Sequence, residues 1–280
     1  MLIKHTIQEV CQWSSVVKKD RLSIGFVPTM GALHQGHLSL IEASVKENDV
    51  TACSIFVNPI QFNNQEDLEK YPRTLEHDLT LLEKAGCNLV FVPSVEEMYP
   101  EQVLEHYYFG HLENVMEGAF RPGHFNGVAV IVNRLFNIVK PDRAYFGEKD
   151  FQQLAIIQEL VKIERIPVEV AACPIVRESD GLAMSSRNTR LSTEERAIAP
   201  KIYRILTKAV ALKDEKSVSE VEQWVADEVG KEKAFKLEYF TIVDNLTLRH
   251  AESWNNPNGL RGCVALWLGK VRLIDNISFS

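Results

Sequence analysis

Short apolar, β-branched runs alternate with helical patterns through the first two thirds of the chain, and this alternation constrains the fold more than any other feature. Apolar residues at helical spacing occupy the segments between the runs. Strands that alternate with crossover helices form a parallel sheet with helices on both faces, and ligands bind beyond the carboxyl ends of its strands. We therefore predict an α/β, Rossmann-like fold. The expected strands are residues 23–28, 50–57, 88–93, 143–146 and 168–172, and the expected helices 38–45, 74–85, 128–139 and 151–163.

The pattern changes after about residue 176. The later segments predict two helices followed by three strands, the last two of which are joined as a hairpin by Gly269 and Lys270. This order indicates a smaller α+β unit, so we expect two domains, 1–176 and 177–280. The expected helices are 193–212 and 217–229, and the expected strands 236–243, 263–268 and 271–274.

Composition limits the classes of partner. At 280 residues, 45% of them apolar, the chain can bury roughly 75% of the surface of its extended form and needs no disulfide or structural metal to fold. Lys and Arg total 31 against 38 Asp and Glu, so the net charge of −7 offers no basic field for nucleic acid. No apolar run approaches the roughly 20 residues that span a bilayer. We therefore expect neither nucleic acid nor a membrane as a partner.

Cysteine usage indicates the compartment. The number of cysteines is odd, and no two of them stand at metal-ligand spacing. This pattern is typical of a reducing environment, so a cytoplasmic protein is expected. The five are Cys11, Cys53, Cys87, Cys173 and Cys263.

The first candidate motif, PTMGALHQGH over residues 28–37, lies where the first expected strand runs into a helix. Gly31 and Gly36 let the backbone approach a ligand closely, and a helix start offers free N–H groups to an anion. His34 and His37 could then face one phosphate. Two surface histidines are the alternative, but the glycine spacing and the strand-to-helix position favour a site. His-x-Gly-His is typical of the nucleotidyltransferase superfamily, with Gln35 in place of its usual isoleucine.

The second motif, FGEKDFQQL over residues 146–154, again joins a strand to a helix. Lys149 could neutralise phosphate charge, and Gln153 lies one helical turn further on, facing the same way. Asp150 either caps the helix, which is the commoner use of aspartate there, or contacts a ribose hydroxyl or an ammonium group.

The third motif, MSSRN over residues 184–188, combines hydroxyl groups with a guanidinium. Ser185, Ser186 and Arg187 form a set suited to phosphate oxygens. Two more polar residues, Asn58 and Gln61, follow the second expected strand and could hydrogen-bond a small polar substrate. Gln61 is the better candidate, because an Asn-Pro turn explains Asn58 in part.

Four further residues have open roles. Arg121 and His124 precede a helix and either reach the site or lie in a solvated loop. Tyr71 is a candidate for the pocket wall. Asp78 is either a carboxylate near magnesium or a charge on a helix surface, the commoner case.

Together the blocks VPTMGALHQGH, SIFVNPIQF, YPRT, EGAFRPGHFNGV, FGEKDFQQL, GLAMSSRN and WLGKVRLIDN closely resemble the pantoate–β-alanine ligase family, also called pantothenate synthetases. The resemblance implies a Rossmann-like domain, a C-terminal lid, a homodimer and Mg-ATP as co-substrate. It also implies two steps, in which pantoate and ATP give pantoyl adenylate and pyrophosphate, and β-alanine then releases pantothenate and AMP. The lysine of the superfamily's related loop is absent, so Arg187 is expected to provide that cation.

The resemblance assigns roles to residues by position in these blocks. His34 and His37 are expected at the triphosphate, with His37 as proton donor to the developing charge. Lys149 and Arg187 are expected to neutralise phosphate oxygens. The implied pantoate contacts are Gln61 and Gln153, with Gln61 also at β-alanine. The implied ATP contacts are Met30, Gly31, Ala32, Leu33, His34, Gln35, Gly36, His37, Gly147, Glu148, Lys149, Asp150, Val176, Met184, Ser185, Ser186 and Arg187.

Two other function classes fit part of the pattern. An adenylyltransferase that joins ATP to a phosphate ester shares the His-x-Gly-His loop. A nucleotide-binding regulatory module would bind ATP without turnover. A tRNA-charging enzyme is disfavoured by the acidic balance and by the lack of an anticodon-reading extension.

Overall fold

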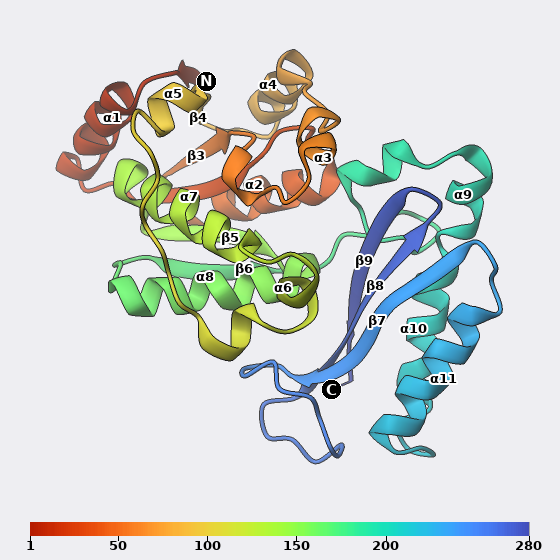
Figure 1. Cartoon of the computed structure of the whole chain (residues 1–280). Helices are drawn as coiled ribbons and strands as arrows, with labels where there is room; N and C mark the ends of the chain where they lie inside the picture. Colours follow the sequence, from red (N-terminus) through yellow and green to blue (C-terminus); the bar gives the residue numbers. More distant parts are fainter. Residues whose placement is uncertain (280) are drawn as a thin grey trace.

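The computed structural model describes residues 1–279 and contains two sheets (Figure 1). The first is a six-stranded parallel sheet of order β1-β4-β3-β2-β5-β6, and the second is a three-stranded antiparallel sheet of order β7-β8-β9. The predicted fold class is therefore confirmed. The strands are β1 (Leu2–Lys4), β2 (Ile24–Thr29), β3 (Val50–Ile55), β4 (Leu89–Phe91), β5 (Arg143–Gly147), β6 (Glu169–Cys173), β7 (Phe235–Asp244), β8 (Leu260–Leu268) and β9 (Val271–Ser278).

Helices cover both faces of the parallel sheet. Alternate residues of a strand point to opposite faces, so Phe26 of β2 joins the core beneath α1, α7 and α8, while the adjacent Val27 joins the core beneath α2 and α4. The α-helices are α1 (Ile7–Lys19), α2 (Gln35–Glu47), α3 (Gln65–Glu69), α4 (Leu75–Lys84), α5 (Val95–Met98), α6 (Met116–Phe120), α7 (His124–Val139), α8 (Phe151–Glu164), α9 (Thr193–Ile198), α10 (Lys201–Ala211) and α11 (Val218–Gly230). Four 3₁₀ turns lie at Pro59–Gln61, Gly110–Glu113, Glu148–Asp150 and Ser186–Arg190.

The second sheet has its own core, which α9, α10 and α11 complete. The expected hairpin is confirmed, since β8 and β9 pair antiparallel across Gly269 and Lys270. The two domains with a boundary near residue 176 stay a prediction. No helix among residues 1–279 combines the length and apolar character that crossing a bilayer requires.

One prediction of secondary structure was wrong, and the N-terminal elements were missed. The single helix expected over 193–212 is two helices, α9 and α10, because Pro200 at the start of α10 has no N–H to continue the first one. The N-terminal β1 and α1 were not predicted at all, although Thr6 and Glu9 form a reciprocal capping box at the start of α1.

Strand order places the site. The chain runs from β2 to β3 in one direction across the sheet and from β5 to β6 in the other, so the loops that follow β2 and β5 diverge and leave a crevice at the carboxyl ends of these strands. The first two motifs of the sequence lie there, because the first follows β2 and the second follows β5.

Candidate active site

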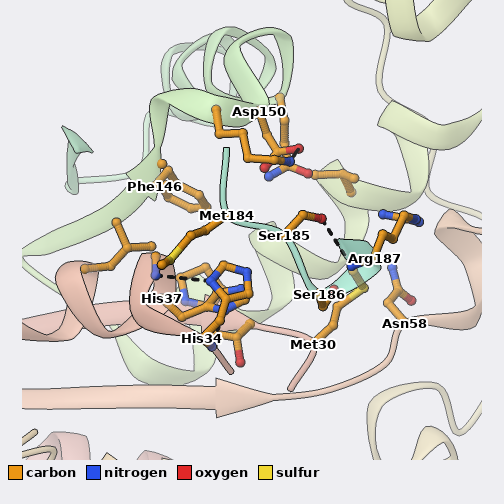
Figure 2. Close-up of a pocket in the computed structure, with 18 of the residues that line it drawn as sticks. Met30, His34, His37, Asn58, Phe146, Asp150, Met184, Ser185, Ser186 and Arg187 are labelled. Atoms are coloured by element: carbon orange, nitrogen blue, oxygen red, sulfur yellow. Dashed lines mark hydrogen bonds and ion pairs between the residues drawn. The ribbon is translucent and has the colours of Figure 1, made fainter. Parts of the chain in front are cut away.

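A cavity lies at the switch point between β2 and β5, and all three predicted motifs reach it. Figure 2 shows His34 and His37 on one side, with Met184, Ser185 and Arg187 on a segment that crosses the cavity. We call residues 30–37 the histidine loop and residues 184–190 the arginine segment. The predicted site residues that line the cavity are Met30, His34, Gly36, His37, Gln61, Gly147, Lys149, Asp150, Gln153, Val176, Met184, Ser185, Ser186 and Arg187.

The histidine loop caps helix α2 with its own side chains. Nδ1 of His34 accepts the N–H of Gly36 at 3.1 Å, and Nδ1 of His37 accepts the N–H of His34 at 3.3 Å. The two rings lie side by side with centroids 4.1 Å apart. A Cβ at Gly36 would come within 2.9 Å of the His34 ring, so glycine is what allows this ring to fold back on the helix start.

The capping bonds set the tautomer of both rings. Burial, reinforced by the charge of Lys149, lowers the pKa of His34 to about 4. Burial, with the neighbouring His34 and Lys149, lowers the pKa of His37 to about 3. Both rings are therefore neutral near pH 7. Because each Nδ1 accepts a backbone N–H, each ring carries its proton on Nε2, where it is a hydrogen-bond donor.

The residues after β5 provide a cation. Nζ of Lys149 lies 3.7 Å from Asp150, and the side chain of Lys149 is 18% exposed. Asp150 occupies the N-cap position of α8 but makes no capping hydrogen bond, so the helix-capping interpretation was wrong. Its carboxylate instead remains beside Lys149 at the cavity.

The arginine segment is held by a long-range ion pair that the sequence did not reveal. Arg187 donates to Asp67 of α3 at 2.9 Å, and Arg190 donates to the second oxygen of Asp67 at 2.8 Å. Although burial opposes the effect, the two guanidinium groups hold the pKa of Asp67 below its usual value. Only one terminal nitrogen of Arg187 is engaged by this pair, and the side chain still lines the cavity.

Amide side chains occupy the end of the cavity beyond β3. Asn58 donates to Gln61 at 3.1 Å and accepts a hydrogen bond from the hydroxyl of Tyr99 at 2.7 Å. His124 contacts the carbonyl of Gln61 at 2.8 Å, and burial lowers its pKa to about 4. As a neutral ring it donates from Nδ1, so His124 fixes the backbone of Gln61 rather than lining this cavity.

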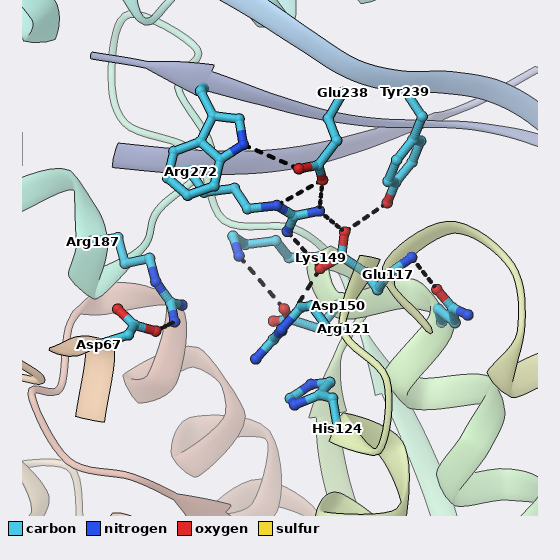
Figure 3. Close-up of polar contacts among 12 residues, drawn as sticks. Asp67, Glu117, Arg121, His124, Lys149, Asp150, Arg187, Glu238, Tyr239 and Arg272 are labelled. Atoms are coloured by element: carbon cyan, nitrogen blue, oxygen red, sulfur yellow. Dashed lines mark hydrogen bonds and ion pairs between the residues drawn. The ribbon is translucent and has the colours of Figure 1, made fainter. Parts of the chain in front are cut away.

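Beside the site, side chains from α6, β7 and β9 form hydrogen bonds around one carboxylate. Glu117 of α6 accepts two hydrogen bonds from Arg272 of β9, at 2.7 and 2.8 Å, and one from Tyr239 of β7 at 2.7 Å. Arg121 lies 3.7 Å from the same carboxylate. In Figure 3 this cluster stands to one side of Lys149 and Asp150, and the ion pair of Asp67 with Arg187 stands to the other.

Not every expected residue reaches the cavity. Glu148 instead pairs with Arg261 of β8 at 3.3 Å. Asp78 is fully buried and outside the cavity lining, and both its oxygens accept hydrogen bonds from the histidine loop. Its proximity to magnesium stays a prediction that these contacts do not favour. Among residues 1–279, no group of three His, Cys, Asp or Glu side chains could hold a metal ion. The other expected ATP contacts outside the lining are Gly31, Ala32, Leu33 and Gln35.

Sequence reasoning missed the apolar wall of the cavity. One face of α7 contributes Val128, Ile131, Val132 and Leu135. The signal was present as a nearly continuous apolar helix, which is read as core by default. Tyr71 lines the cavity as expected.

Comparison with known proteins supports the resemblance. A family model described as pantoate-beta-alanine ligase matches residues 2–278. The pantothenate synthetase of Bacteroides fragilis is 53% identical over 279 residues, which cover 100% of this chain and 99% of the relative. That of Porphyromonas gingivalis is 49% identical, with the same coverage.

Solved structures match over the whole chain as well. The crystal structure of pantothenate synthetase from Thermus thermophilus superposes with a TM-score of 0.93 at 44% identity, covering 100% of this chain and 99% of that one. The ligase of Francisella tularensis, complexed with β,γ-ATP and β-alanine, has a TM-score of 0.83 at 38% identity and covers 100% and 98%.

Proposed function

Because the chain belongs to the pantoate–β-alanine ligase family, we propose that it joins pantoate to β-alanine with consumption of ATP, through a pantoyl adenylate. The observation that carries the proposal is the single cavity at the sheet's switch point. Two neutral imidazole donors, two cationic side chains and two glutamine amides converge on it from elements far apart in the sequence. The relative from Francisella tularensis, complexed with β,γ-ATP and β-alanine, supports these substrates.

In the first step a carboxylate oxygen of pantoate attacks the α-phosphorus of ATP, and the bond from that phosphorus to pyrophosphate breaks. In-line displacement at phosphorus depends on positioning and charge stabilisation rather than on a protein nucleophile. Lys149 and Arg187 would neutralise phosphate oxygens. His37 would act as a neutral donor from Nε2 to the developing charge, beside His34.

In the second step the amine of β-alanine attacks the acyl carbon, AMP leaves with the electron pair of the acyl–oxygen bond, and the amine nitrogen loses its proton. A free carboxylate is a poor acyl donor because the oxygen that would have to leave is too basic. In the adenylate the leaving group is AMP, which is a better leaving group. Gln61 and Gln153 would hold pantoate through both steps, with Gln61 also contacting β-alanine.

Magnesium would enter with the triphosphate, whose charge it partly neutralises. The phosphates would supply most of its ligands, since Mg²⁺ is commonly bound through one or two carboxylates together with substrate phosphates. A homodimer and a cytoplasmic location rest on the family resemblance and on the free cysteines. Sedimentation equilibrium would test the dimer.

The experiment that tests the function is ATP–pyrophosphate exchange with the purified protein. We expect exchange that requires pantoate, and release of AMP only when β-alanine is added. Exchange with a phosphate ester in place of pantoate would indicate an adenylyltransferase. Calorimetric binding of ATP with no exchange under any condition would indicate a regulatory module.

A further inference from the structure

Asp78 is a buried charge that the proposed chemistry does not use. It lies in the first turn of α4, is 0% exposed, and is separated from the cavity by the histidine loop. Its Oδ2 accepts the N–H of Ala32 at 2.9 Å, and its Oδ1 accepts the N–H of Leu33 at 2.8 Å. The hydroxyl of Thr74 also donates to Oδ1, at 3.2 Å. Both oxygens of the Asp78 carboxylate are thus occupied by hydrogen bonds from the histidine loop and from Thr74.

The loop has a backbone conformation that needs such a partner. Gly31 and Ala32 have φ angles of +81° and +50°, in the left-handed region. Alanine pays a steric cost there that glycine does not. Successive N–H groups turned to one side by positive φ form a concave anion-binding nest. Here the anion in the nest is a carboxylate of the same chain.

The position of the nest connects it to the nucleotide site. Leu33 is followed directly by His34, the N-cap of α2, whose ring stacks beside His37 at the cavity. Fixing the N–H groups of Ala32 and Leu33 fixes the two peptide planes that end at Leu33, the residue directly before His34. A change at Asp78 would therefore move the imidazoles without any contact between Asp78 and a ligand.

We propose that Asp78 is a positioning residue, whose carboxylate holds the histidine loop in the conformation that presents His34 and His37 to the nucleotide. The inference rests on the proposed function for the identity of the ligand, the nucleotide. The hydrogen bonds between Asp78 and the loop do not depend on that function. It differs from a role at magnesium, because the carboxylate acts through backbone amides and not through a cation.

The first experiment uses Asp78→Asn, which keeps the shape of the side chain but replaces one acceptor oxygen by a donor. Hydrogen exchange of at least one of the two amides, Ala32 or Leu33, should accelerate about 10-fold or more, the range for a lost hydrogen bond to a charged group. This readout needs no activity, so it stays informative if the proposed function fails. Unchanged exchange at both amides would overturn the inference. Glu76→Gln, which removes an exposed charge from the same helical turn, is the matched control.

The second experiment separates the loop from the metal. Nucleotide affinity of Asp78→Asn should fall by about 10-fold relative to the parent, by the same factor in excess Mg²⁺ and in EDTA. The KM for β-alanine should not change. A loss of affinity that appears only with Mg²⁺ would overturn the inference and assign Asp78 to the cation.

A milder variant covers the case in which Asp78→Asn does not fold. Thr74→Val removes the hydroxyl that supports Oδ1, and it should raise the KM for ATP and the exchange of the Leu33 amide by about 2- to 5-fold. Thr80→Val is its control, since Thr80 lies on the same helix and its hydroxyl donates only to the carbonyl of Glu76, in an exposed hydrogen bond. Equal effects of the two valine variants would count against the inference.

Discussion

The histidine loop and the arginine segment face the same cavity but are held in different ways. The loop is fixed by hydrogen bonds among neighbours in sequence and by a fully buried carboxylate. The arginine segment is fixed by Asp67, which is 120 positions away from Arg187 and has a 27% exposed side chain. One side of the site is therefore prearranged within the fold, and the other depends on an ion pair that solvent can reach. On one side the cavity is lined by imidazole donors held by local hydrogen bonds, and on the other by a cation whose ion pair is partly exposed.

The largest expected effect tests the histidine loop. His37→Ala should slow pantoate-dependent ATP–pyrophosphate exchange by about 100-fold or more, the range for removing one preorganised donor. His37→Gln should lose as much, although glutamine at this position can keep the capping bond to the backbone of His34. Near-native turnover in either variant would refute the donor role. His77→Ala, an exposed histidine on α4, should leave the rate unchanged.

The next largest expected effect tests the arginine segment. Arg187→Ala should raise the KM for ATP by about 10- to 100-fold, because a charge-assisted contact to phosphate is lost. Arg190→Ala is the matched control, since Arg190 binds the same Asp67 but does not line the cavity. Steady-state kinetics in ATP would show the difference. Equal changes in the two variants would mean that the segment acts as a whole and not through Arg187.

A smaller effect tests the ion pair itself. Asp67→Asn should raise the KM for ATP by up to about 5-fold, because a partly exposed pair contributes at most about 1 kcal/mol. In the Arg187→Ala background the same change should add nothing, since Asp67 would have lost the partner through which it acts. Additive effects in the double variant would separate Asp67 from Arg187.

The smallest effect concerns pH. The pKa values of His34 and His37 are lowered to about 4 and about 3, so both rings stay neutral as the pH falls from about 8 to about 5 and protonate only below that range. The value of kcat/KM for ATP should therefore show no acid limb near pH 6.5 from these rings, about the pKa of an unperturbed histidine. A limb at that pH that disappears in His37→Gln would contradict the lowered pKa of His37.

The same contrast explains what sequence could predict. The histidine loop combines glycine, histidine and a strand-to-helix junction within a short stretch, so its place in the fold and at the cavity followed from local pattern. The partner of Arg187 lies 120 positions away in the sequence, and the partner of the Leu33 amide lies 45 positions away. Within a polar stretch of sequence, an acidic residue that has such a partner looks the same as one that is solvated. Nothing in the local spacing of Asp67 or Asp78 distinguishes them from solvated charges.

Other misses had signals that could have been used. Pro200 marks the break between α9 and α10, and the Thr6–Glu9 capping box marks the start of α1. The apolar face of α7 was visible in the sequence, but it could not be assigned to a cavity wall, since a helix that lines a ligand cavity and one that lies in the core share the same composition.

The carboxylate of Glu117 has a mechanical consequence. Removing one partner of a pair as enclosed as Glu117 and Arg272 costs about 3–5 kcal/mol, whereas the pair at Asp67 contributes about 0–1 kcal/mol. Truncating either member of the enclosed pair should therefore destabilise the fold more than truncating Asp67 does. The pair at Glu117 therefore ties α6 to β9 of the second sheet more firmly than Asp67 ties α3 to the arginine segment.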